Sequence, residues 1–184
     1  CAMNSDRGEQ GAMPPAVGIS NQGEFFMSIT TQIAKNGDWE KLSLFGPINE
    51  DAELHLPKLL QALGAKIIVN FKAVESVNSC GVRAWITFMR ELEKGRSIIF
   101  EECTADIVGQ INMIPNFRGK ADVQSVYATY TCQHCGNHQQ HLFVKGKNLP
   151  QTAGDGGGDV ACGKCAKPTE MDEIEEEFFA WVES

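Results

Sequence analysis

The sequence contains no apolar run that is long enough to cross a bilayer, and it has few basic residues. Its most apolar segments, at 66–71 and 84–89, are soon interrupted by charge, whereas a membrane helix needs about 18 apolar residues in succession. Lys and Arg number 16 against 24 Asp and Glu, which gives a formal net charge of −8. The short apolar runs disfavour membrane insertion. The negative charge repels a phosphate backbone, so nonspecific nucleic-acid binding is also disfavoured.

Catalytic motifs are also missing from the sequence. The glycine-rich stretch at 154–158 is not followed by the Lys-Ser or Lys-Thr and the helix that a phosphate-binding loop requires. No hydrolase triad and no carboxylate pair stands out, so we expect a protein that is not an enzyme. With 184 residues, of which 42% are hydrophobic and 22% charged, the chain is long enough for one ordinary core and an appendage.

Three segments with different residue patterns follow one another along the chain. Residues 1–22 are broken by glycine and proline and show no apolar period, which is typical of a flexible tail. Residues 23–131 alternate between strand and helix patterns and form the expected main domain. Residues 132–184, with four basic and nine acidic residues, form the expected second unit.

The main domain shows short apolar segments with strand character. These segments are 25–34, 39–45, 66–71, 97–100 and 123–130. Ile67, Ile68 and Val69 form an uninterrupted branched run, which is typical of a strand covered by helices on both faces, so we place this segment at the sheet centre. Helical patterns lie between the strands, and this alternation predicts an α/β fold.

Three helices are expected in the main domain. The strongest pattern covers residues 81–94, where apolar residues recur every three or four positions and Gly95 ends the helix. A second covers 104–114, with Thr104 as its N-cap. A shorter helix is expected to begin near Pro57, because proline cannot donate a backbone hydrogen bond and favours the first turn.

A C-terminal acidic helix is expected at the end of the second unit. Thr169 followed by Asp172 is a capping signal, and apolar residues share one face after it: Met171, Ile174, Phe178 and Val182. Phe179 and Trp181 widen this apolar face, which we expect to pack on the neighbouring domain. The opposite face carries six acidic residues: Glu170, Asp172, Glu173, Glu175, Glu176 and Glu177. We interpret it as a solvated face, with a docking surface as the alternative.

Four of the seven cysteines form two identical Cys-x-x-Cys motifs: Cys132 with Cys135, and Cys162 with Cys165. This spacing lets one turn aim two sulfurs at one ion, and two such turns complete a closed tetrahedral shell. The motifs therefore predict a structural zinc site in a zinc ribbon, although the 26-residue spacer exceeds the usual length of about 15–20 residues. Two disulfides, a redox motif or an iron site are the alternatives.

The residues around these motifs receive less specific interpretations. Three histidines are expected at the surface, since four sulfurs already fill the shell: His134, His138 and His141. Four lysines are expected to surround the ligands and offset their charge: Lys145, Lys147, Lys164 and Lys167. Cys80 and Cys103 have no partner nearby in the sequence, and we interpret both as small buried apolar residues.

The turn Asn78-Ser79-Cys80-Gly81 lies between the central strand and the strongest helix. Asn78 or Ser79 suits the N-cap position, and capping alone is enough to explain the residue types. Taken with the block at 44–49, the strand at 66–77 and the helix and strand that follow, this turn resembles the STAS domain of anti-sigma-factor antagonists over roughly residues 25–130.

The resemblance implies a STAS-like mixed sheet flanked by helices, in a bacterial cytoplasmic signalling protein that binds a regulatory protein partner. In that family the turn reads Asp-Ser-Ser-Gly or close to it, and the anti-sigma-factor kinase phosphorylates the serine after the aspartate. Carried onto this chain, the resemblance makes Ser79 the candidate phosphoacceptor. It makes the whole turn the partner surface: Asn78, Ser79, Cys80 and Gly81.

This chain departs from the family pattern at three positions. Asn78 replaces the aspartate, Cys80 replaces the second serine, and Pro57 is expected to shorten the first helix. A phosphate at Ser79 would meet free backbone N–H groups and the positive end of the helix dipole, so it would act on a partner and not on the fold. Two other functions stay open: a non-switching scaffold whose zinc ribbon binds a protein, and the less favoured nucleic-acid binding by the ribbon.

Overall fold

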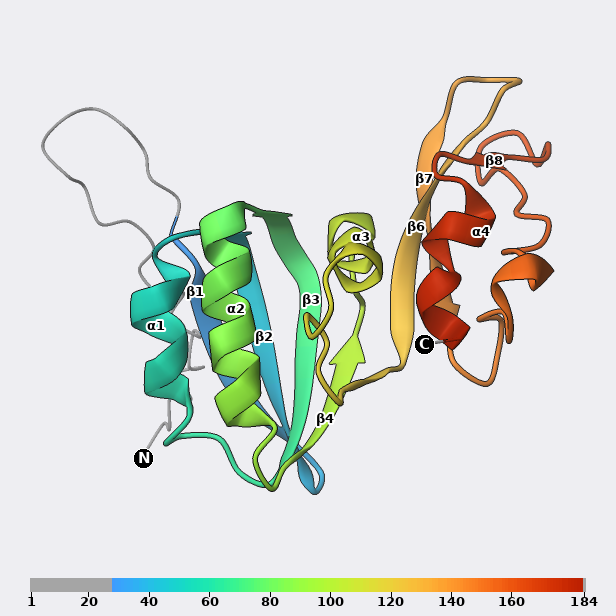
Figure 1. Cartoon of the computed structure of the whole chain (residues 1–184). Coiled ribbons are helices and arrows are strands. Elements are labelled where there is room, and N and C mark those ends of the chain that lie inside the picture. Colours follow the sequence, from blue (N-terminus) through green and yellow to red (C-terminus); the bar gives the residue numbers. More distant parts are fainter. Residues whose placement is uncertain (1–27, 184) are drawn as a thin grey trace, which may run out of the picture.

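A computed structural model describes residues 28–183, so the predicted tail at 1–22 and the beginning of the first predicted strand lie outside the described residues. Five strands form the main sheet, in the order β1-β2-β3-β4-β5 (Figure 1). Their bounds are β1 Thr30–Asn36, β2 Trp39–Ile48, β3 Lys66–Val77, β4 Ser97–Glu101 and β5 Asp122–Val123. β1 pairs antiparallel with β2, and the other neighbours pair in parallel, so the sheet is mixed. β3 is its central strand, as predicted.

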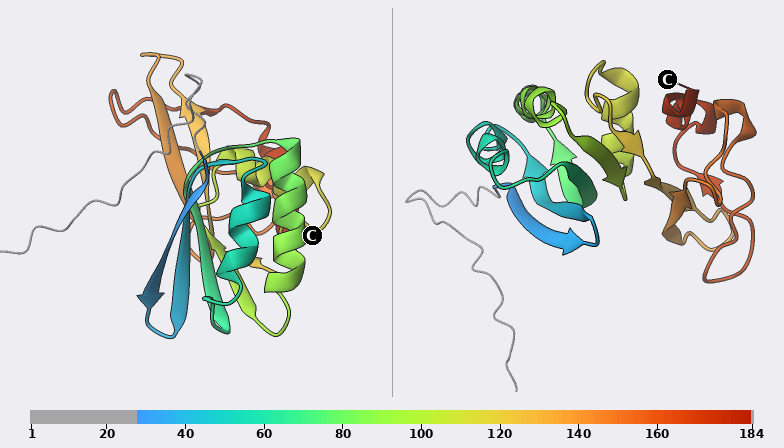
Figure 2. Two further views of the ribbon diagram at one scale, coloured as in Figure 1. Left: turned by 90° about the vertical axis from the view of Figure 1, so that its left-hand side faces the viewer. Right: turned by 90° about the horizontal axis from the view of Figure 1, so that it is seen from below.

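Three helices cover one face of this sheet, as the view from below shows (Figure 2). They are α1 Ala52–Leu59, α2 Ser79–Leu92 and α3 Ala105–Met113. The chain therefore has a mixed α/β fold with a sheet flanked by helices. The expectation of helices on both faces of β3 is wrong. Ile67 and Val69 belong to the core beneath the helices, whereas Ile68 points to the opposite face. On either side of β3, Lys41 of β2 and Glu101 of β4 form an ion pair, with Lys41 Nζ 3.1 Å from Glu101 Oε2.

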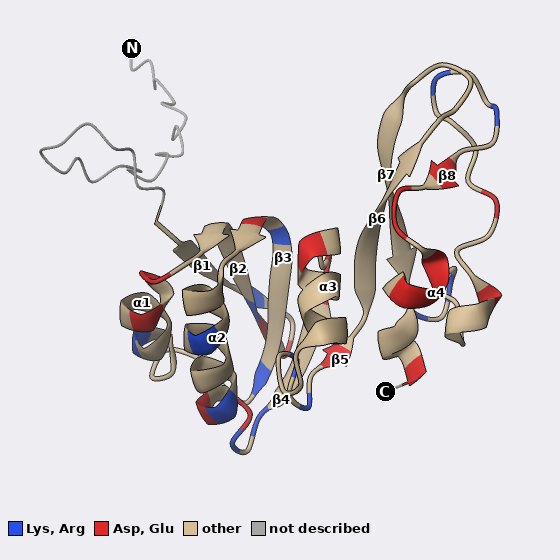
Figure 3. Ribbon diagram, turned by 45° about the horizontal axis from the view of Figure 1, so that its top comes forward, with Lys and Arg blue, Asp and Glu red and all other residues tan. Residues whose placement is uncertain are grey.

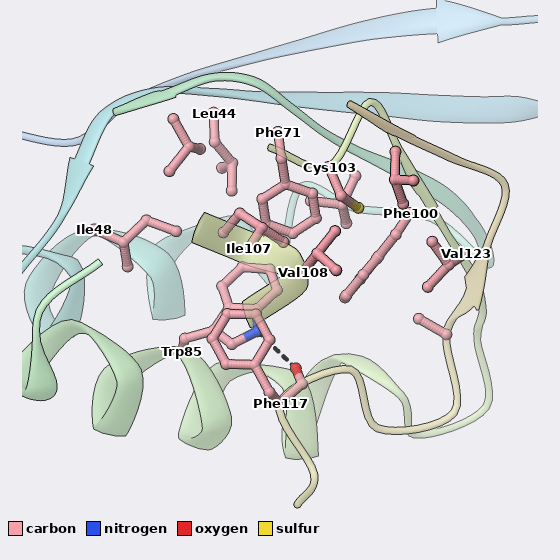
Figure 4. Close-up of a cluster of buried hydrophobic side chains, with 14 of the residues drawn as sticks. Leu44, Ile48, Phe71, Trp85, Phe100, Cys103, Ile107, Val108, Phe117 and Val123 are labelled. Carbon is pink, nitrogen blue, oxygen red and sulfur yellow. Dashed lines mark hydrogen bonds between the residues drawn. The ribbon is translucent and has the colours of Figure 1, made fainter. Parts of the chain in front are cut away.

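Aromatic side chains fill the space between the helices and the sheet (Figure 4). Phe71 of β3 lies edge-on to Trp85 of α2 and to Phe100 of β4, with ring centroids 5.4 and 4.9 Å apart. The indole N–H of Trp85 donates to the backbone oxygen of Phe117 at 2.8 Å, which satisfies its polar atom inside the core. This contact fixes the segment after α3 against α2.

The start of α1 differs from the prediction. The helix begins at Ala52, five residues before the predicted start, and Pro57 lies inside it. Proline removes only one hydrogen bond here, the one to the carbonyl of Glu53 on the exposed side of the helix. Because α1 ends at Leu59, the lost bond interrupts little of the helix.

A second, three-stranded sheet has the order β7-β6-β8, with bounds β6 Ser125–Thr131, β7 His138–Val144 and β8 Glu170–Met171. We predicted β6 as a strand of the main domain, but it pairs with β7 and β8. It also touches the main sheet through a parallel bridge between Cys103 and Val126. The two sheets therefore divide between β5 and β6, and not at Cys132.

The C-terminal helix is shorter than predicted. α4 covers Glu175–Phe178, and two 3₁₀ turns, η1 Ala153–Asp155 and η2 Ala180–Glu183, pack near it. The expected start at Thr169 is wrong, because the Thr169 hydroxyl donates to the Val160 oxygen at 2.7 Å and the next two residues form β8. Phe179 and Trp181 are buried as expected, in a hydrophobic core that is continuous between the two sheets. No helix in the described part of the chain is long and apolar enough to span a bilayer.

Candidate functional site

Asn78 caps the first turn of α2 at the carboxyl end of the central strand. Its side-chain oxygen accepts a hydrogen bond from the Gly81 N–H at 2.8 Å, and its backbone is extended. Its backbone N–H donates to the Ile48 oxygen at 3.2 Å, at the end of β2. Asn78, and not Ser79, is therefore the N-cap, and Ser79 is the first residue of the helix.

Gly81 lets the first turn of α2 approach the end of β2 closely. A Cβ atom at this position would lie 1.9 Å from the Ile48 backbone oxygen and 2.9 Å from the Asn49 nitrogen. No side chain fits at these distances, so the glycine is required by backbone proximity. This contact fixes the first turn of α2 in place on the end of β2.

Ser79 is exposed, and its hydroxyl makes no hydrogen bond to any residue between 28 and 183. Cys80 beside it is also exposed, so our interpretation of Cys80 as a buried residue is wrong. Cys103 is buried as expected, and burial raises the pKa of its thiol far above the ordinary value. The turn therefore presents one hydroxyl and one thiol to solvent.

Charges of both signs lie near the Ser79 hydroxyl. The Glu50 carboxylate accepts a hydrogen bond from the side-chain amide of Asn78 at 3.1 Å. Arg83 is exposed one turn further along α2, at the four-residue spacing that brings side chains together. A negative group on Ser79 would thus lie at the N-terminus of α2, one helical turn before Arg83 and next to the residue that binds Glu50.

The four predicted metal ligands come together in the structure. Their sulfur atoms all lie within 4.8 Å of one another, and these cysteines are the only such group of His, Cys, Asp or Glu among residues 28–183. The Cys132 and Cys165 sulfurs are 3.5 Å apart, and those of Cys135 and Cys162 are 3.7 Å apart. Zinc bonded to four sulfurs at about 2.3 Å would separate them by about 3.8 Å, so the cluster has the size of a tetrahedral thiolate site.

The two cysteine turns have the same backbone geometry. The N–H of Gly136 donates to the Cys132 oxygen at 2.8 Å, and the N–H of Ala166 donates to the Cys162 oxygen at 2.8 Å. Both donors have positive φ, 67° at Gly136 and 56° at Ala166. The N–H of Lys164 donates to the Cys162 sulfur at 3.4 Å and, together with hydrogen bonds from the neighbouring cysteines, lowers the pKa of that thiol, which favours a thiolate, whereas the neighbouring cysteine thiols raise the pKa of Cys165.

The residues around the cluster fit the predictions only in part. His134 and His138 are exposed, His141 is half-buried, and none of the three belongs to the cluster. Lys145 and Lys147 do not surround the ligands, because β7 runs away from the cluster and they follow its far end. Lys164 lies inside the second cysteine turn, and Lys167 follows it.

Gln139 supports the second cysteine turn and was not predicted. Its side-chain oxygen accepts from the Gly163 N–H at 2.8 Å, and its amide group donates to the Ala161 oxygen at 3.0 Å. Gln139 thus ties β7 to a turn that lies 24 residues further along the chain. A glutamine in a strand gives no signal for such a role in the sequence.

A polar cluster at the junction of the two sheets was also not predicted. The Glu102 carboxylate accepts from the Asn70 amide at 2.7 Å and from the Tyr127 hydroxyl at 2.9 Å, and it lies 3.4 Å from Lys72 Nζ. Burial raises the pKa of Glu102, but these three groups outweigh burial and hold the pKa below its ordinary value. Glu102 also has a positive φ of 51°, a conformation that costs energy in a residue other than glycine.

Comparisons with known proteins find similarity over only part of the chain. No family model matches the chain, and no curated protein matches it. A solved structure of the anti-sigma factor antagonist SpoIIAA in its unphosphorylated form is similar to part of it, with 24% sequence identity and a TM-score of 0.30. The similarity covers 39% of this chain and 72% of that chain.

Proposed function

We propose that this chain is a bacterial cytoplasmic regulatory protein that binds a protein partner through the turn Asn78-Ser79-Cys80-Gly81. The partner is of the anti-sigma-factor kinase class, and phosphorylation of Ser79 switches the interaction. The observation that carries the proposal is the Ser79 hydroxyl, which is exposed and without a partner among the described residues. The resemblance of the surrounding sequence to STAS domains also supports this turn as the partner surface.

A phosphate on Ser79 would act through its charge on the partner. The first turn of α2 is held by the Asn78 cap and by the close approach of Gly81 to Ile48, so the backbone has little room to respond. Phosphorylation adds about −1.5 to −2 charges, which repel acidic groups of a docked partner and have to be desolvated in the interface. Partner affinity therefore changes while the domain stays folded.

The four cysteines hold a structural zinc ion in this proposal. Cys132, Cys135, Cys162 and Cys165 would supply all four ligands, and the closed shell leaves no position for a substrate. The metal would connect the turn after β6 to the turn that precedes β8. It thereby stabilises a unit that has only three strands, one of them two residues long.

A non-switching scaffold is the second candidate function. The residues between the paired cysteines are exposed, namely Gln133, His134, Gly163 and Lys164. In this case the cysteine turns contact the partner directly, and Ser79 has no role in binding.

The test starts with the intact mass of protein purified from its native host, which should include a fraction heavier by one phosphate. This fraction should be absent from Ser79→Ala. Partners captured from the host lysate are then compared for Ser79→Ala, Ser79→Asp and the control Ser97→Asp, which adds the same charge at an exposed position at the opposite end of the sheet. Loss of a partner with Ser79→Asp alone is the expected result.

Two outcomes would contradict the switch. If all three variants capture the partner equally and Ser79 carries no phosphate, the proposed switch is wrong. Loss of the partner with Cys132→Ser but not with Ser79→Asp would favour the scaffold.

A further inference from the structure

A cleft of about 810 Å³ lies where the two sheets meet. Three segments line it: residues 118–123 at the entry to β5, the turn that follows β7, and the last residues of η2. Its volume is within the range of about 300–1,000 Å³ that is usual for small-molecule sites, and junctions between structural units are a frequent place for them.

The cleft is separate from the Ser79 surface. Ser79 begins α2, a helix of 14 residues that spans about 21 Å. The cleft adjoins the other end of this helix, where the Lys120 N–H donates to the Glu93 carboxylate at 3.2 Å. The binding of a ligand in the cleft is therefore independent of the partner surface that we propose around Ser79.

The lining of the cleft is basic in a chain that is acidic overall. Four cationic residues line it, Arg118, Lys120, Lys145 and Lys147, against one acidic residue, Asp122. Lys145 Nζ is 2.6 Å from Asp122 Oδ1 and neutralises it, which leaves Lys120 and Lys147 as two uncompensated positive charges in the lining, whereas the whole chain carries −8. The ammonium groups of Lys120 and Lys147 contact no acidic group that the structure describes.

The fold brings these charges together from distant parts of the sequence. The Lys145 N–H donates to the Gln124 oxygen at 2.8 Å, so the turn after β7 returns to the segment that enters β6. Like charges repel one another, and no ion pair within residues 28–183 offsets Lys120 or Lys147. An anion in the cleft would remove this repulsion.

Part of the lining of the cleft is apolar. Leu149, Pro150 and Val182 are half-buried there, and Trp181 is 5% exposed. The C-terminal segment contributes Trp181 and Val182 to this part of the lining, and it is held in place because the Ala153 N–H donates to the Glu183 carboxylate at 2.9 Å. A ligand with both an anionic group and an apolar part would contact both the basic and the apolar residues of the lining.

We propose that this cleft is a binding site for a small organic phosphate ester, whose phosphate lies between Lys120 and Lys147 and whose apolar part packs against Leu149, Pro150 and Val182. A phosphate fits better than a single carboxylate, since it carries close to two negative charges and presents several acceptor oxygens to the cations. The bounded volume favours a small molecule over a polymer. A nucleic acid would need a basic track beyond the cleft, but residues 132–184 carry four basic and nine acidic residues.

The test uses the full chain, loaded with zinc, and follows backbone amide signals by ¹H–¹⁵N NMR during titration. The probes are phenyl phosphate, inorganic phosphate and the uncharged benzyl alcohol. We expect saturable shifts at 118–123 and 145–150 with phenyl phosphate, weaker binding of inorganic phosphate and no saturation with benzyl alcohol. Lys120→Gln/Lys147→Gln should weaken phenyl phosphate binding about tenfold or more.

Two controls separate this proposal from general charge effects and from the proposed function. Lys35→Gln/Lys58→Gln removes the same charge from β1 and α1, away from the cleft, and should leave binding unchanged. Ser79→Asp should also leave it unchanged, so each proposal fails or stands independently. Absence of saturable binding, equal binding by the two double variants, or shifts elsewhere overturns the site. Tighter binding of a mixed-sequence oligonucleotide, with shifts that continue beyond the cleft, overturns the small-molecule assignment.

Discussion

The Tyr127 hydroxyl of β6 donates to the Glu102 carboxylate at the end of β4 across 2.9 Å and joins the second sheet to the first. Tyr127→Phe removes this donor and leaves the ring in place. Hydrogen bonds to a charged group contribute about 1.5–3 kcal/mol, so we expect a loss of about 1–2 kcal/mol in the free energy of unfolding at pH 7 for this partly exposed pair. Urea unfolding monitored by fluorescence measures it.

The same contact gives a pH dependence with a defined sign. The folded-state pKa of Glu102 is held below its ordinary value, so its stabilisation is complete above the unfolded-state pKa and is lost as pH falls through the folded-state pKa. The destabilisation by Tyr127→Phe should therefore shrink in acid. Both proteins are compared in the same buffers, so that acid loss of a bound metal affects them equally. A difference that does not change between pH 7 and the acid limit would contradict the assignment.

Gly81→Ala is expected to be among the most damaging single-methyl additions in the chain. The new Cβ would lie 1.9 Å from the Ile48 backbone oxygen, which has no freedom to move aside. We therefore expect the free energy of unfolding to fall by about 3 kcal/mol or more. Gly109→Ala is the matched control, because Gly109 lies inside α3 and its Cβ would meet nothing within 4 Å. The free energy of unfolding of this control should rise by about 0.5–1 kcal/mol, because alanine has a higher helix propensity than glycine. Equal effects of the two substitutions in thermal unfolding would contradict the close approach.

Ala166→Gly should stabilise the second cysteine turn. Ala166 has a φ of 56°, where an L side chain is strained, and the first turn has Gly136 in the same place. Relief of this strain should raise the free energy of unfolding by up to about 1 kcal/mol, and Gly136→Ala should lower it by about the same amount. The two variants are measured in zinc-saturated buffer, and a loss on Ala166→Gly would contradict the geometry.

Metal content tests the four-cysteine site directly. The holo protein should contain one zinc ion per chain, and a chelator should lower the unfolding temperature. Cys132→Ser should lose the metal, whereas Cys80→Ser, at an exposed cysteine outside the cluster, should retain it. Stoichiometric disulfide in the native protein, with no bound metal, would contradict the site.

Glu173 is expected to reduce stability at neutral pH. Burial raises its pKa, the charges of Asp172 and Asp106 raise it further, and its Oε2 atom is buried without a hydrogen-bond partner in the described residues. A raised folded-state pKa means that stability is highest in acid and is lost as pH rises through that pKa. Glu173→Gln should therefore increase the free energy of unfolding at pH 8, and the gain should shrink toward pH 5. Glu176→Gln, at an exposed position, is the control.

Local patterns predicted the elements that depend on neighbouring residues. The periodic segment at 81–94 forms α2, with Asn78 as its cap, and the branched run at Ile67 forms the central strand. The cysteine spacing predicted which four sulfurs meet, because the geometry of each pair is fixed within one short turn.

The sequence-based predictions were wrong where contacts between distant residues decide the local structure. The sequence around Thr169 favours a helix cap, but pairing with β6 and a hydrogen bond to Val160 make this segment extended. Lys145 and Lys147 are close to the cysteines in sequence, yet a seven-residue strand separates them in space. The junction cluster and the cleft both join residues from separate segments, and no single segment carries a pattern for them.

The parallel bridge between Cys103 and Val126 sets the direction of β6. β6 runs the same way as β3, so Cys132 and Ser79, which follow these two strands, lie toward one end of the molecule (Figure 1). The acidic residues of β8 and α4 gather on the second unit beside this end (Figure 3). One continuous core connects the two units and restricts their movement relative to each other. A macromolecule that contacts both the Ser79 turn and the cysteine turns must therefore have contact regions at the same separation.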